Sequence, residues 1–293
     1  MSEHWILDPE AKTEPAHGCA PDERSIEQLL SASVILLDKP AGPSSHQLAA
    51  WAKDMMGLEK MGHGGTLDPF ATGVLPLLLG KTMRLTGAML GQGKCYIAVM
   101  RFSEKPGTDE LASATAALQG RIYNVPPEIS AVKVQVRTRT ISAFEVLDVD
   151  GRFAVMKIEC EAGTYIRTIA RDLGLLLAQE VELVELRRTF SGNFGERHCV
   201  TMEMIADAFW LWQTKSDEAA LRKMLLPIET LVEVYPQVLV KDAAVGALSH
   251  GAPLARPGLV SVSKGASKGE TVCIMTLKGE VVALAELLVD SDS

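Results

Sequence analysis

The sequence predicts an α/β (α+β) protein in which a mixed domain is followed by a small β-rich domain. A length of 293 residues fits about two domains at about 150 residues each. The chain is 47% hydrophobic and 23% charged, a balance typical of globular proteins that bury a core. Alternating and helical apolar spacings are mixed in the first part of the chain, whereas short apolar runs separated by Gly and Pro follow from Val238.

The first 33 residues are predicted to form an acidic arm. They carry seven acidic and two basic side chains and show little apolar periodicity, apart from one helical turn expected around Ser25 to Leu30. Order begins with a buried strand at Val34 to Leu37, and Ser44 or Ser45 then caps a helix. The expected apolar face of that helix, with Trp51 in the core, consists of Leu48, Trp51, Ala52 and Met55.

A glycine-rich segment, Gly62 to Pro69, is the sharpest local feature. Its adjacent glycines permit close backbone approach, and Asp68-Pro69 forms a turn that can present a carboxylate. Alternatively, Asp68 caps a helix that starts at Pro69. The spacing alone leaves both interpretations open.

Strands and helices alternate through the rest of the first domain, which we place at residues 34–232. Strands are expected at Cys95 to Phe102 and Arg152 to Glu161, and helices at Thr108 to Gln119 and Ile166 to Leu177. Two further helices are expected at Met202 to Trp212 and Asp217 to Leu226. The β-rich domain is expected at residues 236–293, with strands at Thr271 to Leu277 and Val281 to Leu284.

Cysteine usage and hydropathy predict a cytoplasmic protein without a metal site. No two of the five cysteines have the spacing of zinc ligands, so they are expected to be reduced thiols. The longest apolar run, residues 73–80, contains Pro76 and is too short to span a membrane. The N-terminus lacks the basic and apolar regions of a signal peptide.

Five segments in the expected order resemble the motifs of TruB and dyskerin type pseudouridine synthases. They are Gly62 to Pro76, Leu37 to Pro40 with Gly42 to His46, Lys94 to Ala98, Gly163 to Arg167, and Leu186 to Thr189 with Ser191-Gly192. The C-terminal part resembles a PUA domain. The resemblance implies a pseudouridine synthase fold, with a mixed, mostly antiparallel sheet flanked by helices, followed by a small PUA pseudo-barrel.

By this resemblance Asp68 is the nucleophile that isomerises uridine in RNA. A free aspartate is ionised at neutral pH and needs no base to activate it. Arg167 corresponds to an arginine that pairs with the catalytic carboxylate, and Tyr96 to a tyrosine that stacks on the target base. The resemblance implies four substrate-binding residues, namely His63, Tyr165, Leu186 and Lys39. Because the reaction involves no redox change, no cofactor is implied.

The short segment from Gly120 through Ser130 to Lys133 resembles archaeal and dyskerin-type enzymes, in which small core proteins and an H/ACA guide RNA place the substrate. The resemblance implies tRNA (the T-loop uridine at position 55) and/or rRNA as targets. Phe70-Ala71 is closer to bacterial relatives and leaves open a stand-alone tRNA enzyme. A catalytically silent RNA-binding scaffold is the alternative, but it has no chemical need for Asp68, Tyr96 and Arg167 together.

The net charge of -8 is unusual for a protein that contacts phosphates. The acidity is concentrated at the two ends of the chain, since residues 1–33 carry a net -5 and residues 286–293 a net -3. The remainder is near neutral. A basic strip remains as a candidate RNA contact, consisting of Arg121, Lys133, Arg137 and Arg139.

Overall fold

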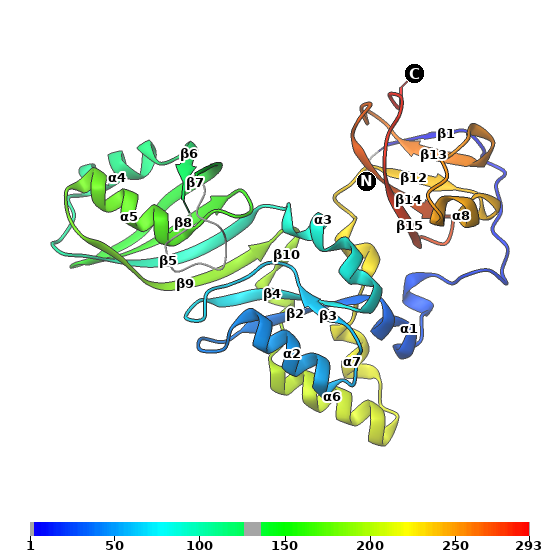
Figure 1. Cartoon of the computed structure of the whole chain (residues 1–293), viewed down its shortest axis with the longest axis horizontal. Coiled ribbons are helices and arrows are strands. Elements are labelled where there is room, and N and C mark those ends of the chain that lie inside the picture. The colour runs from blue at the N-terminus through cyan, green and yellow to red at the C-terminus, as the bar shows by residue number, and fades with distance from the viewer. Residues whose placement is uncertain (1–2, 126–135, 293) are drawn as a thin grey trace. The chain divides into compact units, whose positions relative to one another are not determined.

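The computed structural model describes residues 3–125 and 136–292, which form two compact units (Figure 1). The central unit is Val34–Met224, and the second unit combines the residues up to Ser33 with those from Leu225 onward. The acidic segment 1–33 thus belongs to the same unit as the C-terminal residues. The three-part division into 1–33, 34–232 and 236–293 stays a prediction.

A mixed, mostly antiparallel sheet forms the centre of the central unit, as the family resemblance implies. Its order is β2-β4-β9-β5-β8-β7-β6, with β3 added on β4 and β10 on β9. Among these described strands the β4–β9 pair is parallel and the other neighbours are antiparallel. The strands are β2 (Ser33–Lys39), β3 (Met61–His63), β4 (Thr72–Leu79), β5 (Lys94–Phe102), β6 (Gly120–Asn124), β7 (Arg137–Asp150), β8 (Phe153–Cys160), β9 (Val181–Ser191) and β10 (Phe194–Gly195).

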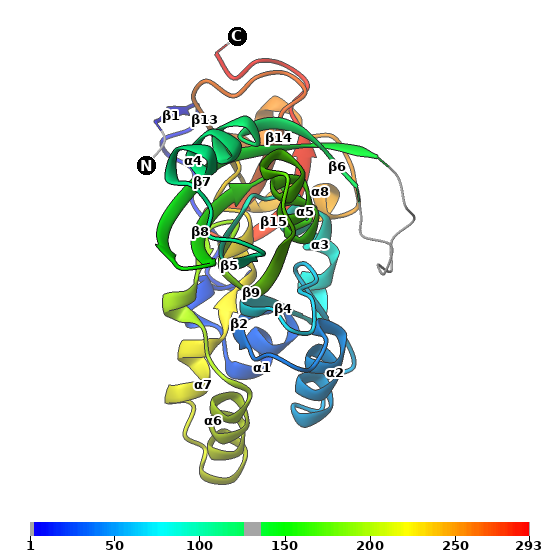
Figure 2. The same cartoon turned by 90° about the vertical axis from the view of Figure 1, so that its left-hand side faces the viewer.

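Two helices, α4 (Thr108–Ala117) and α5 (Ile166–Leu177), pack against the β5-β8-β7 part of this sheet and against each other (Figures 1 and 2). The bounds of α5 are those that the helical spacing predicts, and Ile169 and Leu173 are fully buried on its inner side. The apolar stripe of α5 therefore fixes the orientation of its first turn, which carries Arg167.

Helix α2 (Ser45–Met55) lies beside α6 (Met202–Lys215) in the same unit. Ser44 caps α2 by accepting a hydrogen bond from the Gln47 amide. The prediction that Trp51 is core is wrong, because its side chain is 52% exposed. The buried stripe is rotated from the predicted one and consists of Ser45, Leu48, Ala49, Ala52 and Met56.

The remaining elements of the central unit are short helices. They are α3 (Thr86–Leu90), α7 (Ala219–Met224) and the 3₁₀ turns η2 (Gly80–Leu85) and η3 (Glu196–His198). No α-helix starts at Pro69, so the interpretation of Asp68 as a helix cap is wrong. Instead the Ala71 amide donates to the Asp68 carbonyl at 3.1 Å, and β4 begins at Thr72.

The second unit is built on a sheet of order β1-β13-β12-β14-β15. Its strands are β1 (His4–Ile6), β12 (Gln237–Val240), β13 (Leu259–Ser263), β14 (Thr271–Thr276) and β15 (Val281–Glu286). Helix α8 (Asp242–Ser249), which the sequence analysis missed, packs its Leu248 into the core of this sheet. The other short elements are η1 (Pro21–Glu23), α1 (Ile26–Ser31), β11 (Leu226–Pro227), η4 (Ile228–Leu231) and η5 (Arg256–Gly258).

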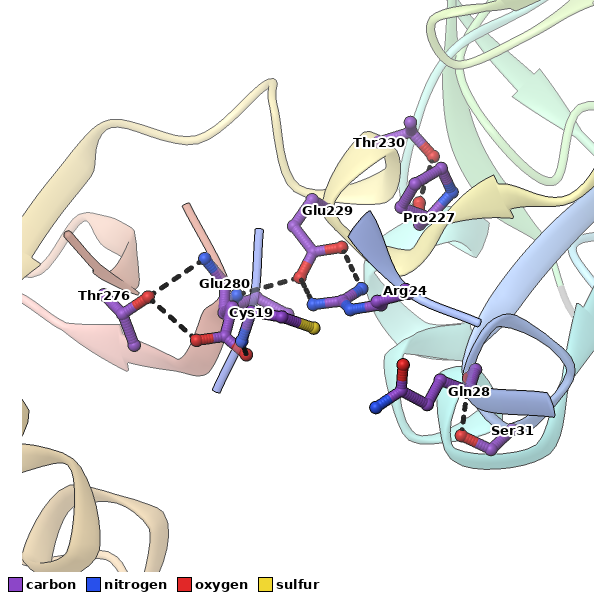
Figure 3. A network of polar contacts seen from close by, with 10 residues as sticks. Cys19, Arg24, Gln28, Ser31, Pro227, Glu229, Thr230, Thr276 and Glu280 are labelled. Carbon is purple, nitrogen blue, oxygen red and sulfur yellow. Dashed lines mark hydrogen bonds and ion pairs between the residues drawn. The ribbon is translucent and has the colours of Figure 1, made fainter. Parts of the chain in front are cut away.

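The acidic arm is attached to the second unit by strand pairing and by a buried ion pair. Strand β1 pairs with β13 in antiparallel register. Arg24 donates two hydrogen bonds of 2.8 Å to the Glu229 carboxylate (Figure 3). The same carboxylate accepts a hydrogen bond from the Val281 amide. The Cys19 amide donates to Glu280. The predicted helical turn around Ser25 to Leu30 is confirmed as α1.

Candidate active site

The loop that carries Asp68 is held by the N-terminal end of α2. The Ser45 hydroxyl accepts a hydrogen bond from the Leu67 amide at 2.9 Å and donates to the Leu67 carbonyl at 3.2 Å. Leu67 itself is buried in the hydrophobic core that the sheet forms with α4 and α5. On the other side of Asp68, the Pro69 carbonyl accepts from the Gly42 amide at 2.8 Å. Asp68 is therefore flanked by two backbone positions that cannot move freely.

Lys39 ties the same loop to the end of β2. Its ammonium group donates to three carbonyls, those of Pro40 at 2.8 Å, Pro69 at 3.0 Å and Ala71 at 2.8 Å. The residue is completely buried, and burial lowers the pKa of its ammonium group. Because all three donors are used, Lys39 supports the loop in this structure, and its predicted contact with substrate stays a prediction.

Asp68 and Arg167 form an ion pair at the surface of the site. Arg167 Nη2 lies 2.9 Å from Asp68 Oδ1, and each side chain is about one-third exposed. The hydrogen bonds on either side of Asp68 hold the pair in place, and its exposed surface is accessible to a ligand. Arg167 Nε is buried without a hydrogen-bond partner among the described residues.

The first turn of α5 is fixed by a side chain that the sequence analysis did not identify. Asn124 Oδ1 accepts from the Tyr165 amide at 2.9 Å, and Asn124 Nδ2 donates to the Tyr165 carbonyl at 3.3 Å. Asn124 is 1% exposed and ends β6. It thereby positions half-buried Tyr165 and, two residues later, Arg167. No motif in the sequence marks Asn124 as part of the site.

Tyr96 and Leu186 form an apolar wall next to the loop. Both are buried in one cluster with Leu67 and Ala71, the residues on either side of Asp68. Burial raises the pKa of the Tyr96 phenol, whereas the charge of Arg188 and a hydrogen bond from it act in the opposite direction. The sequence places these residues in separate motifs, and the β5–β9 pairing brings them together.

His63 ends β3 on the approach to the glycine pair. Its ring contacts the ring of His46 edge to face, with centroids 4.6 Å apart. Burial, with repulsion from His46 and Arg188, lowers the pKa of His63 from 6.5 to about 4. His63 is therefore neutral at physiological pH, and its Nδ1 has no partner among the described residues.

The described residues contain no cluster of three or more His, Cys, Asp or Glu side chains that could hold a metal. Within the same residues, no helix is long and apolar enough to cross a membrane. All five cysteines are free thiols. Of the predicted basic strip, Lys133 lies outside the described residues, as does the Ser130 to Lys133 pattern.

Family models match nearly the whole chain. The N-terminal domain of TruB family pseudouridylate synthases matches residues 53–166, and the tRNA pseudouridylate synthase B C-terminal domain matches residues 167–233. A DKCLD (NUC011) domain matches residues 3–49, and a PUA domain matches residues 236–293.

Relatives and solved structures agree with these matches. The probable tRNA pseudouridine synthase B of Methanopyrus kandleri is 44% identical, covering 95% of this chain and 82% of the relative. The probable tRNA pseudouridine synthase B of Pyrococcus abyssi is 42% identical, covering 98% of this chain and 86% of the relative. A chain from the crystal structure of a Cbf5-Nop10-Gar1 complex superposes with a TM-score of 0.92 at 42% identity, covering 100% of this chain and 89% of the other. A chain from an H/ACA RNP bound to a substrate RNA containing 2'-deoxyuridine has the same TM-score and coverage at 40% identity.

The sheet and the matches to family models and relatives define a pseudouridine synthase. These relatives share more than 40% identity over nearly the full chain. The chain belongs to the TruB family, in a form that also contains a PUA domain. The predicted family, fold class and enzyme class are confirmed.

Proposed function

We propose that this enzyme isomerises uridine to pseudouridine in RNA with Asp68 as the nucleophile. The observation that carries the proposal is the ion pair between Arg167 Nη2 and Asp68 Oδ1, which lie 2.9 Å apart. Hydrogen bonds from Lys39 and to Ser45 hold the loop that carries Asp68. Arg167 orients one carboxylate oxygen and leaves the other available for attack. The exposed third of each side chain gives a substrate access to the pair.

The isomerisation conserves all atoms of the nucleoside. The bond from ribose C1' to uracil N1 breaks, the uracil turns, and C1' bonds to uracil C5. The proton on C5 is lost and N1 gains one, so the reaction needs no oxidant or reductant. The protein has to supply a nucleophile, a closed environment for the turning base, and groups that hold it.

The residues around Asp68 suit these tasks. A base must leave its stack to react, and the buried aromatic Tyr96 offers a face that compensates for lost stacking. Leu186, on β9, belongs to the same buried cluster as Tyr96, and Tyr165 is the N-cap of α5, two residues before Arg167. His63, neutral at physiological pH, is the further candidate for a contact with RNA. Lys39 contributes by holding the loop.

The RNA substrate and partners follow from the relatives. The relatives named above are probable tRNA pseudouridine synthases, and the similar solved chains come from complexes with Nop10, Gar1 and substrate RNA. We infer that this chain acts mainly as the catalytic subunit of an H/ACA ribonucleoprotein, with small core proteins and a guide RNA, in the cytoplasm. A weaker, guide-independent activity on the T-loop uridine at position 55 of tRNA accompanies it.

The test compares rRNA-like and tRNA substrates, with and without a hairpin guide RNA and the small core proteins. Pseudouridine is mapped by chemical probing, and Asp68→Asn is the negative control. Guide-dependent turnover on rRNA and slower turnover on tRNA are expected. Equal rates in all conditions reject the guided role and favour a stand-alone tRNA enzyme. No product in any condition, with RNA still bound, favours a silent scaffold.

A further inference from the structure

Arg188 on β9 is an almost fully buried arginine behind the catalytic loop. It is 1% exposed, and its guanidinium donates through Nε to the Val74 carbonyl at 2.8 Å and through Nη2 to the Gly65 carbonyl at 3.1 Å. Gly65 precedes Asp68 by three residues, and Val74 follows it by six. One side chain thus joins the two ends of the segment that carries the nucleophile.

The backbone beside Arg188 is matched to this contact. Gly73 lies opposite Arg188 in the parallel β4–β9 pair. A Cβ atom on Gly73 would lie 2.2 Å from the Arg188 carbonyl oxygen, so only glycine permits this approach. The close pairing brings the guanidinium within reach of both ends of the loop.

Neither Arg188 nor its buried neighbour Lys94 forms an ion pair with a carboxylate in residues 3–125 and 136–292. Lys94 is 7% exposed and donates to the Met89 carbonyl. Burial, with repulsion from Arg188, lowers the pKa of Lys94 to about 8. Two buried cations without a counter-ion are costly to the fold, and a purely structural role is better served by apolar side chains.

The guanidinium of Arg188 also acts on groups inside the site. It lies opposite Tyr96 in the antiparallel β5–β9 pair, where its charge lowers the pKa of the Tyr96 phenol, and the same charge disfavours protonation of His63. Tyr96 in turn interacts electrostatically with Asp68. Arg188 therefore contacts the loop of the nucleophile and the residue expected to hold the target base.

We propose that Arg188 is a positioning residue of the isomerisation, which fixes the loop between Gly65 and Val74 and the Tyr96 ring in one arrangement so that Asp68 faces the bound uridine. The role rests on the proposed function, because it acts through Asp68 and Tyr96. Placement errors of about 1 Å can cost about 100-fold in rate, so a clamp on both ends of the loop has a large effect on turnover.

The test uses Arg188→Met and Arg188→Lys in the full chain. Methionine preserves the apolar stem and removes the donors, and lysine preserves the charge but cannot reach two carbonyls in a planar fork. We expect the single-turnover rate at saturating RNA to fall by about 100-fold in Arg188→Met, with RNA affinity changed by no more than a few fold. Hydrogen exchange in peptides covering residues 62–76 should accelerate in both variants, and lysine should restore only part of the rate.

A control separates positioning from general loss of stability. Arg24→Met removes another buried arginine, in the second unit, and should leave the exchange of residues 62–76 and the saturating rate unchanged. If Arg188→Met does not fold, the single-turnover rate and the loop exchange of Arg188→Lys test the proposal. A wild-type rate in a folded Arg188 variant, or unaltered loop exchange, overturns the proposal. Wild-type protein without pseudouridine activity overturns the proposed function instead, while loop exchange still tests the clamp.

Discussion

At the scale of single residues, the chemistry depends on the Asp68 carboxylate and on what holds it. Asp68→Asn keeps the size and the hydrogen bond to Arg167 but removes the nucleophile. We expect pseudouridine formation to fall by about 10,000-fold or more, with RNA affinity within a few fold of wild type. Single-turnover assays and a filter-binding measurement check both. Substantial turnover in this variant would contradict the assignment of the nucleophile.

Arg167 offers a second prediction with a control on the same helix. Arg167→Ala should lower the rate by about 100-fold, and Arg167→Lys should recover little, since an ammonium cannot reproduce the guanidinium geometry. Arg171→Ala, one turn later on α5, removes the exposed ion pair with Asp172 and should stay near the wild-type rate. Thermal denaturation verifies that all three variants fold. A fully active lysine variant would argue against the pairing role.

His63 predicts a pH dependence of stability. Its folded-state pKa, about 4, lies below the unfolded value of 6.5, so the unfolded chain binds more protons between these values. The free energy of unfolding should therefore fall as the pH is lowered from about 6.5 to about 4, and His63→Gln should lose that part of the dependence. Urea denaturation across this pH range measures the difference. A difference between the two proteins that stays constant with pH contradicts the burial argument.

Sequence motifs located the residues of the candidate site, but they could not distinguish a residue that contacts the substrate from one that holds the loop. Lys39 and Asp68 both lie in motif segments, yet Lys39 is buried under three carbonyls and Asp68 is accessible. Asn124 and Arg188 act through the backbone of distant segments, which becomes visible only once the strands are paired. The helical spacing predicted an apolar face that included Trp51, whereas the buried stripe is rotated and leaves the tryptophan exposed.

At the scale of elements, the parallel contact of β4 with β9 depends on one glycine. Gly73→Ala combines a positive φ of 98° with a steric overlap on the Arg188 backbone, so we expect a loss of about 3 kcal/mol or more in the free energy of unfolding. Gly120→Ala is the matched control, since Gly120 has φ 94° and open space around a new Cβ. It should cost about 1 kcal/mol. Equal losses would show that strain alone matters at Gly73.

Elements with strong periodicity were predictable from sequence, whereas short elements held by tertiary contacts were not. Helix α5 follows its apolar stripe from end to end. Helix α8 spans only eight residues, has no side-chain cap, and lies in a segment whose Gly and Pro content indicates strands and turns. The partner of β1 could not be predicted either, because β13 is more than 250 residues away in the chain.

At the scale of the whole molecule, the charge is divided between the units. The residues up to Ser33 and those from Leu225 onward carry the entire net charge of -8, and Val34–Met224 is neutral. The acidic arm and the acidic C-terminal end belong to one unit. Phosphate contacts near the catalytic site therefore depend on local clusters of Arg and Lys in a neutral unit, and salt should weaken RNA binding.

The final prediction concerns what holds the acidic arm in the second unit. Arg24, from the arm, pairs with Glu229 after β11 (Figure 3). Glu229 also accepts a hydrogen bond from the amide of Val281 at the start of β15. Three segments distant in sequence meet at one carboxylate. The side chains of Arg24 and Glu229 are 13% and 9% exposed, so little solvent screens this ion pair.

Removing Arg24 would leave Glu229 buried without its guanidinium, and such losses cost about 3 to 5 kcal/mol. We expect Arg24→Ala to accelerate hydrogen exchange in β1, β13 and β15 while α5 and β9 keep their protection, because each unit has its own core. Arg101→Ala removes the half-exposed pair with Glu182 and should cost less than about 1 kcal/mol. Exchange that rises equally in both units, or in neither, would contradict an anchor specific to the arm.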